Sequence, residues 1–185
     1  MQERRLISAM RDPRPHVGEP LALDLLNTRW MSADGPQDLL TDVAGLRCWL
    51  VANDLGDRCG ADEKTRAALV QAREAVLRVV LERSSGSADQ LNAVLDQGRI
   101  RRTLADSGPR DDVEVPRSEW LPGWLAADNL LQLLAESAGR IKQCAHPHCV
   151  LWFFDTSKNG TRRWHSMTTC GNRAKAARHY AAKRD

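Results

Sequence analysis

The sequence lacks the long apolar runs that would place it in a membrane. No stretch approaches the roughly 20 consecutive apolar residues that a spanning helix requires. The opening residues, MQERRLISAM, also lack the apolar segment of a signal peptide. We therefore expect a cytoplasmic protein that has no membrane partner.

Signatures of common enzymes are missing as well. The sequence contains no recognisable Ser/His/Asp set, no glycine-rich phosphate loop and no H-E-x-x-H motif. It also has no internal repeat and no low-complexity tract. These absences favour a binding protein over an enzyme, so we predict no catalytic residues.

Cysteine usage argues against a disulfide framework. The chain has five cysteines, an odd number, and Cys48 and Cys59 have no obvious partner in the sequence. The other three fall near the carboxyl end at metal-ligand spacing. This pattern fits a reducing compartment, where thiols stay free.

The carboxyl-terminal residues carry the most informative motif. Cys144, Cys149, His165 and Cys170 follow the frame C-x4-C-x15-H-x4-C. Three thiolates and one neutral imidazole complete the tetrahedron of a structural zinc ion and leave no position for water. We predict one bound Zn²⁺ with these four ligands, and no open metal site for catalysis.

Two alternatives to this ligand set deserve weighing. Cys144 and Cys149 are also compatible with buried thiols or a small disulfide. His146 and His148 lie between them as competing ligands, but Pro147 restricts that loop. We therefore favour His165 as the fourth ligand.

Charge divides the chain into two unequal parts. Residues 140–185 hold ten Lys and Arg against two acidic residues, whereas residues 1–139 hold 17 basic and 22 acidic residues. The overall charge of +3 hides this asymmetry. We predict a front region, residues 1–139, and a separate zinc finger, residues 140–185, with different partners.

Apolar residues in the front region recur with helical spacing. Capping residues and Gly or Pro stops place helices at 21–26, 43–50, 62–82, 87–104 and 120–138, with Thr41 or Asp42 capping the second and Asp62 the third. Residues 111–116 alternate weakly and read as an edge strand or an extended loop. The predicted fold class is mainly α, with a helical bundle at the amino-terminal end.

The finger shows a different pattern. A knuckle at 144–149 precedes an apolar strand at 150–154, and Asn159-Gly160 is a strong hairpin signal that leads into a return strand at 161–164. Ser166 is placed to cap a helix that contains Cys170. Knuckle, hairpin and helix together predict a treble-clef-like finger, in which the metal replaces a core too small to hold itself.

Basic side chains gather on this finger. At 100° per residue, Cys170 and Ala174 fall on one face of the predicted helix and Lys175 and Arg178 on the opposite face. A rigid basic helix beside a zinc site is typical of modules that bind DNA, although a solvated surface is the plain alternative. The predicted DNA-binding residues are Arg162, Arg163, Asn172, Arg173, Lys175 and Arg178.

Two polar residues interrupt the first apolar helix. Asp24 and Asn27 lie one turn apart among leucines. They are candidates to line a ligand pocket, but a buried polar side chain more often bonds a neighbouring backbone. Both interpretations stay open at this point.

Motifs in both regions resemble a known pair of families. The tail CAHPHCVLWFFDTSKNGTRRWHSMTTCGNRAKAARHY looks like the CGNR zinc finger, with its signature at 170–173 intact. The run Gly18-Glu-Pro-Leu-Ala-Leu-Asp24-Leu-Leu-Asn27-Thr28 resembles the opening of the ABATE domain, which commonly precedes that finger in bacterial stress-induced transcription regulators. One position departs from the pattern, because His165 stands where the family usually has Cys. A histidine keeps the tetrahedron possible with one negative charge fewer.

The resemblance implies a bacterial transcription regulator. The finger would bind DNA, and the front region would sense a small-molecule effector or form a homodimer. The alternative is a zinc-stabilised protein-interaction module without specific DNA binding. Binding to DNA that weakens steeply with added salt would favour the first interpretation.

Overall fold

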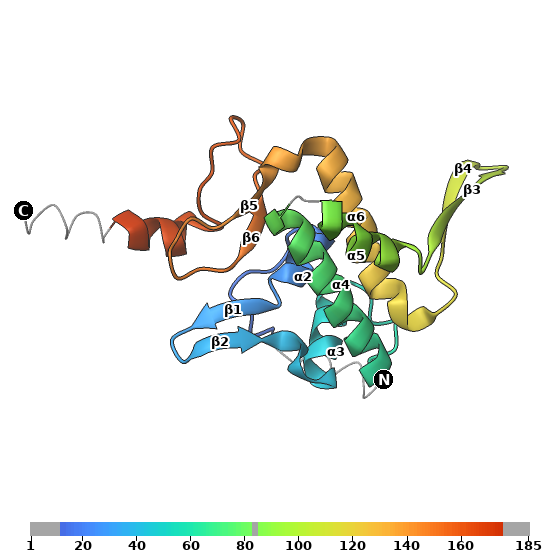
Figure 1. Cartoon of the computed structure of the whole chain (residues 1–185), viewed down its shortest axis with the longest axis horizontal. Coiled ribbons are helices and arrows are strands. Elements are labelled where there is room, and N and C mark those ends of the chain that lie inside the picture. The colour runs from blue at the N-terminus through green and yellow to red at the C-terminus, as the bar shows by residue number, and fades with distance from the viewer. Residues whose placement is uncertain (1–11, 83–84, 176–185) are drawn as a thin grey trace, which may run out of the picture.

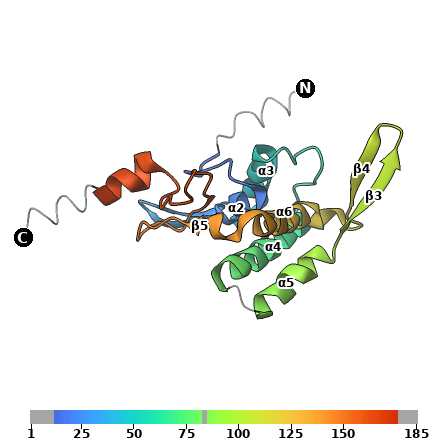
Figure 2. The ribbon, with the colours of Figure 1, turned by 90° about the horizontal axis from the view of Figure 1, so that it is seen from above.

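The computed structural model describes residues 12–82 and 85–175, and helices dominate its front region (Figure 1). They are α2 (Leu21–Leu26), α3 (Val43–Ala52), α4 (Glu63–Glu82), α5 (Ser85–Leu95) and α6 (Leu121–Ser137). The predicted mainly α class with a helical amino-terminal bundle is confirmed. Figure 2 shows the finger at one end of the bundle and a projecting hairpin at the other.

Helix α2 lies at the centre of the core. Ala22, Leu23 and Leu25 are fully buried, and α2 contacts α4, α6 and the finger strand that contains Trp152. Helices α4 and α6 approach closely at Gly123, where an added Cβ would lie 2.8 Å from the Cβ of Ala72. A short helix of leucines therefore becomes the element around which the longer helices pack.

The predicted helix starts are confirmed by their caps. The Asp42 carboxylate accepts from the Gly45 N–H at 2.8 Å, and Asp62 accepts from the Thr65 N–H at 2.8 Å. Each bond satisfies a backbone donor that the first turn of a helix leaves without a partner. Asp42, rather than Thr41, is the cap of α3.

A hairpin that the sequence patterns did not predict follows α2. Strands β1 (Arg29–Ser32) and β2 (Gly35–Asp38) pair antiparallel, and Gly35 adopts a positive φ of 109° at their turn. The strands are short and half-exposed, so they carry little hydrophobic periodicity. The Arg29–Asp38 ion pair joins the strands at one end, and Trp30 packs against the core.

The predicted fourth helix is wrong beyond Leu95. Ile100 and Leu104 lie instead in a second hairpin, in which β3 (Arg99–Ala105) pairs antiparallel with β4 (Gly108–Glu114). The edge-strand interpretation of 111–116 is confirmed for the part within β4. Figures 1 and 2 show this hairpin extending away from the helices.

Two features explain why the helix stops there. The Trp124 indole N–H donates to the Leu95 carbonyl at 2.9 Å, which caps the end of α5 from another helix. After Gly98, the arginines of β3 face the carboxylates of β4, and Arg101 pairs with Glu114 across the strands at 2.6 Å. Leu104 is 83% exposed, so it does not belong to a buried helix face as the apolar spacing predicted.

The finger sheet also differs from the prediction. Strand β6 (Trp152–Phe154) pairs antiparallel with β5 (Ile141–Gln143), not with residues 161–164, which form no strand. Residues 157–160 do form a turn, with a Gly160 φ of 60° and a Gly160 N–H to Ser157 carbonyl bond of 3.1 Å. The Asn159-Gly160 signal therefore marks a turn within a loop, not a hairpin.

A continuous core joins the finger to the helices. Ile141, Trp152 and Phe154 belong to the same apolar cluster as the buried residues of α2, α4 and α6. The division of the chain into two domains, residues 1–139 and 140–185, stays a prediction. Among the described residues, no helix is long and apolar enough to cross a membrane.

Candidate metal centre and basic surface

The four predicted ligands come from three separate segments. Cys144 follows β5 directly and its N–H donates to the Leu151 carbonyl at 2.9 Å, while Cys149 ends the knuckle with an N–H bond to the His146 carbonyl at 2.9 Å. Cys170 lies in a π-helical turn, Met167–Gly171, capped as predicted by the Ser166 side chain at 3.3 Å from the Thr169 nitrogen. His165 precedes that cap and ends a loop rather than the predicted strand.

The ligand atoms of Cys144, Cys149, His165 and Cys170 all lie within 4.8 Å of one another. Cys144, His165 and Cys170 are buried, and Nδ1 of His165 lies 3.5 Å from the Cys149 sulfur. Sulfur and imidazole donors gathered in this way suit zinc, and four of them close its coordination sphere. The site is that of one structural zinc ion.

Local electrostatics set the protonation of the ligands before metal binds. Burial raises the pKa of Cys149 to about 12, with help from the neighbouring Cys144 and Cys170. Burial also lowers the pKa of His165 to about 4, assisted by His16 and Arg162. The imidazole is therefore neutral at pH 7, the form that binds a metal, whereas the thiols must release their protons to solvent when the metal binds.

The front region supplies one wall of this site. The His16 ring centroid lies 4.9 Å from that of His165, and His16 Nε2 is 2.8 Å from a Glu19 carboxylate oxygen. The other Glu19 oxygen accepts from the Phe154 N–H at 2.9 Å. The loop before α2 thus contacts both the metal ligand and the finger sheet.

Asp155 organises the loop that replaces the predicted return strand. Its buried carboxylate accepts from the Lys142 ammonium at 2.7 Å, the Ser157 hydroxyl at 2.6 Å and the Arg162 N–H at 2.9 Å. Burial alone would raise the pKa of Asp155, but these bonds outweigh it and hold the pKa well below its usual range. Residues 155–162 therefore wrap around one carboxylate instead of pairing as a strand.

Three of the predicted DNA-binding side chains are exposed cations. Arg163, Arg173 and Lys175 are exposed, and none forms an ion pair with another described residue. The Arg163 guanidinium lies over the Trp164 ring at 5.3 Å from its centroid. Asp155 is the only acidic residue between positions 140 and 175, and it is buried. Among the residues that the structure describes, no acidic side chain therefore pairs with these three cations.

The other predicted positions differ in their surroundings. Arg162 donates to the carbonyls of Trp164 and His165 and lies 4.6 Å from the Phe153 ring centroid, so its guanidinium has internal partners. Asn172 is exposed and donates to the Thr168 carbonyl at 3.3 Å. Arg178 lies outside the described residues.

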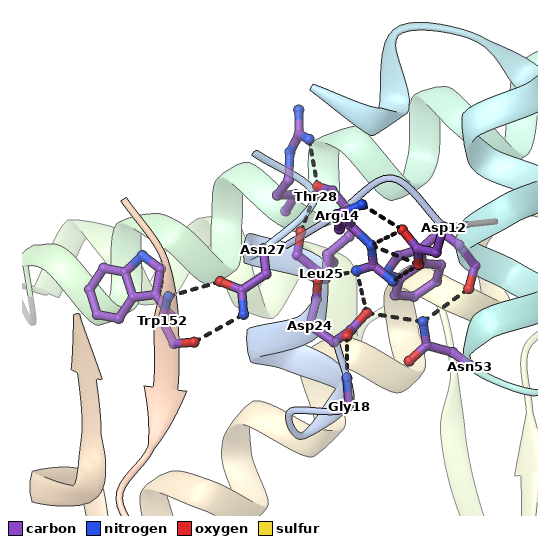
Figure 3. A network of polar contacts seen from close by, with 11 residues as sticks. Asp12, Arg14, Gly18, Asp24, Leu25, Asn27, Thr28, Asn53 and Trp152 are labelled. Atoms are coloured by element: carbon purple, nitrogen blue, oxygen red, sulfur yellow. Dashed lines mark hydrogen bonds and ion pairs between the residues drawn. The ribbon is translucent and has the colours of Figure 1, made fainter. Parts of the chain in front are cut away.

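Asp24 and Asn27 are fixed by buried hydrogen bonds (Figure 3). Asp24 accepts from Arg14 at 2.7 Å, from the Gly18 N–H at 3.1 Å and from Asn53 at 3.0 Å. Asn27 bonds both backbone groups of Trp152. These contacts hold the loop before α2 and the finger sheet, and the predicted ligand-pocket role of the pair stays untested.

A helical domain that ends in a Cys₃His zinc finger is the class of protein that this fold and site define. Comparison with family models agrees for both parts: the CGNR zinc finger matches residues 140–183, and ABATE, described as "Putative stress-induced transcription regulator", matches residues 19–140. The chain therefore belongs to the ABATE family and carries a CGNR zinc finger. These are regulator and zinc-finger families. No curated protein matches the chain.

Sequence reasoning missed two parts of the site. Asp155 belongs to no motif, although a single acid inside a basic segment indicates a partner for the neighbouring cations. The packing of His16 and Glu19 on the finger left no local signal, because it joins residues about 140 positions apart.

Proposed function

We propose that this protein is a transcription regulator that binds DNA through the exposed basic side chains of its zinc finger. The observation that carries the proposal is that Arg163, Arg173 and Lys175, which are close in sequence to the metal ligands, are exposed and form no ion pair with any described residue. Phosphate contacts supply most of the affinity of such surfaces.

The contrast with the front region supports this assignment. There, most of the described arginines face acidic partners, as in Arg73 with Asp38 at 2.7 Å and Arg102 with Asp111 at 3.3 Å. The finger leaves its exposed cations without acidic partners in the described part of the chain. Net charge alone would be consistent with a solvated surface, but clustering beside a rigid metal site favours a polyanionic partner.

The metal would act as the structural support of this surface. Cys144, Cys149, His165 and Cys170 would hold zinc, which supplies the stability that so small a segment lacks. Arg162 supports the same loop from within, through its bonds to the Trp164 and His165 carbonyls. The front region then serves as the part that senses an effector or forms a dimer.

The test is retention of duplex DNA by the zinc-loaded protein over a range of salt concentrations. We expect the logarithm of the binding constant to fall linearly with the logarithm of salt, with a slope that loses about 0.9 for each phosphate contact removed. The triple variant Arg163→Ala, Arg173→Ala, Lys175→Ala should bind more weakly and with a shallower slope. Unchanged binding by this variant contradicts the proposal.

The matched control is the triple variant Arg99→Ala, Arg101→Ala, Arg102→Ala. These arginines lie on β3 and face acidic residues of β4. The control removes the same charge at a distant surface, so it should bind DNA as the wild type does. If no form of the folded, metallated protein retains DNA, the finger is instead a protein-interaction module.

A further inference from the structure

A cavity lies where the front region meets the finger. It has a volume of about 530 Å³, and its walls come from the β1–β2 hairpin, α4 and the finger sheet. Apolar lining residues include Leu26, Met31, Leu77, Leu81, Val150 and Trp152. Ligand pockets of folded proteins are commonly 300 to 1,000 Å³ and mostly apolar, so both size and lining suit a small organic molecule.

Three of these apolar side chains are more exposed than their neighbours in the core. Met31 is 43% exposed, Leu81 57% and Val150 38%, although each lines the cavity. They come from three segments that are distant in sequence: β1, α4 and the loop before β6. Apolar side chains that converge on one concave site from separate elements are typical of a binding surface rather than of scattered exposure.

The charged residues of the wall are Arg29, Asp38 and Arg73, and all three are already paired. Arg73 donates both terminal nitrogens to Asp38 at 2.7 Å, and Arg29 pairs with Asp38 at 3.2 Å and with Glu74 at 2.7 Å. Together with Glu74, which lies outside the lining, two cations and two carboxylates balance in charge. A charged ligand would lose its hydration here without gaining a free counter-charge. An uncharged ligand would not have this desolvation cost.

We infer that this cavity binds an uncharged, ring-containing apolar molecule and that the molecule acts as the effector of the finger. Trp30 and Trp152 on the lining favour flat rings as the occupant. Binding itself requires only the cavity, whereas the effector role rests on the proposed function.

A short connection links the cavity to the metal site. Val150 and Trp152 line the cavity, and the residue between them, Leu151, accepts the backbone hydrogen bond of Cys144 at 2.9 Å. Trp152 is also fixed to α2 by Asn27. An occupant that packs against 150 and 152 would therefore stabilise the strand that positions the first zinc ligand.

The test uses N-phenyl-1-naphthylamine, an uncharged two-ring-system probe whose fluorescence rises in apolar surroundings. We expect saturable binding of one probe per zinc-loaded chain. Met31→Glu and Leu81→Glu, which change exposed residues on separate elements, should each weaken binding about tenfold, equivalent to about 1.4 kcal/mol. Leu104→Glu, at an 83% exposed position on β3, is the control and should bind as the wild type does.

Each outcome decides part of the inference. Absence of saturable binding, or equal affinity in all three variants, overturns the site. Tighter binding of 1-anilinonaphthalene-8-sulfonate, which adds a negative charge to similar rings, overturns the uncharged class. Zinc loss to a chelator that is no slower with the probe bound overturns the link to the finger.

These results are independent of the DNA test. Probe binding without DNA retention would keep the cavity and reject the proposed function. DNA retention without probe binding would keep the proposed function and reject the cavity as a binding site.

Discussion

The side-chain amide of Asn27 donates to the Trp152 carbonyl at 3.0 Å and accepts from the Trp152 N–H at 2.8 Å. This is the pairing that a neighbouring strand would make. Strand β6 therefore has β5 along one edge and two side chains, those of Asn27 and Glu19, on the other. Because Asn27 is fully buried, water cannot replace either bond if the amide is lost.

Asn27→Asp should destabilise the protein by about 2 kcal/mol, because the carboxylate keeps the acceptor but faces the Trp152 carbonyl without a donor. Urea unfolding followed by tryptophan fluorescence measures the change. Asn92→Asp is the matched control, since Asn92 is exposed on α5. Equal stability of the two variants would show that the pairing with Trp152 does not contribute.

His165→Cys should retain one equivalent of zinc, because the added thiolate restores the ligand that the family usually has at this position. Cys170→Ala should lose most of the metal, and with it the ordered finger, while the front region remains helical. Elemental analysis and far-ultraviolet circular dichroism give the two readouts. Cys59→Ala removes a buried thiol outside the cluster and should leave the metal content unchanged. Full zinc content in Cys170→Ala would reject this ligand set.

Local chemistry made part of this molecule predictable. The caps at Asp42, Asp62 and Ser166 depend on one side chain and its own helix, so the sequence alone identifies them. The four zinc ligands were predictable for a related reason: their residue types leave few other uses at that spacing. Helix starts and metal ligands are thus the features confirmed most fully.

Tertiary contacts decided what the sequence left open. Helix α5 ends where the Trp124 side chain, about 30 residues later in the sequence, caps the Leu95 carbonyl. No residue pattern near Leu95 predicts this contact. Strand β6 pairs with β5 and not with residues 161–164, which are nearer in sequence, because hydrogen bonds to Asp155 hold the segment that includes Arg162 in a loop. Contacts between the front region and the finger, such as that of His16 with His165, were invisible for the same reason.

Asp38→Asn should lower stability by about 2 kcal/mol at neutral pH, because the buried Arg73 guanidinium loses its charged partner. Burial would raise the pKa of Asp38, but Arg73, the Leu40 N–H and Arg29 lower it. A lowered folded-state pKa gives stability that is present above the unfolded value of about 3.9 and is lost as pH falls further.

The gap between wild type and Asp38→Asn should therefore narrow below about pH 4. Both proteins lose zinc in acid as the ligands protonate, so their difference in urea stability at each pH isolates Asp38. Asp34→Asn, at an exposed turn position of the same hairpin, is the control. A gap that stays constant from pH 7 to pH 3 would contradict the assigned role of the carboxylate.

Gly45→Ala should destabilise the front region by about 3 kcal/mol or more, because a Cβ at this position would lie 1.6 Å from the Leu39 carbonyl oxygen. That oxygen belongs to the backbone of a 3₁₀ turn, Leu39–Thr41, and cannot rotate away as a side chain would. Gly86→Ala is the matched comparison, since its Cβ would meet nothing within 4 Å on α5, and it should raise stability by about 0.5 kcal/mol. Urea midpoints that move in opposite directions support the close packing of the turn on α3. Similar midpoints for both variants would place the two elements farther apart than the structure does.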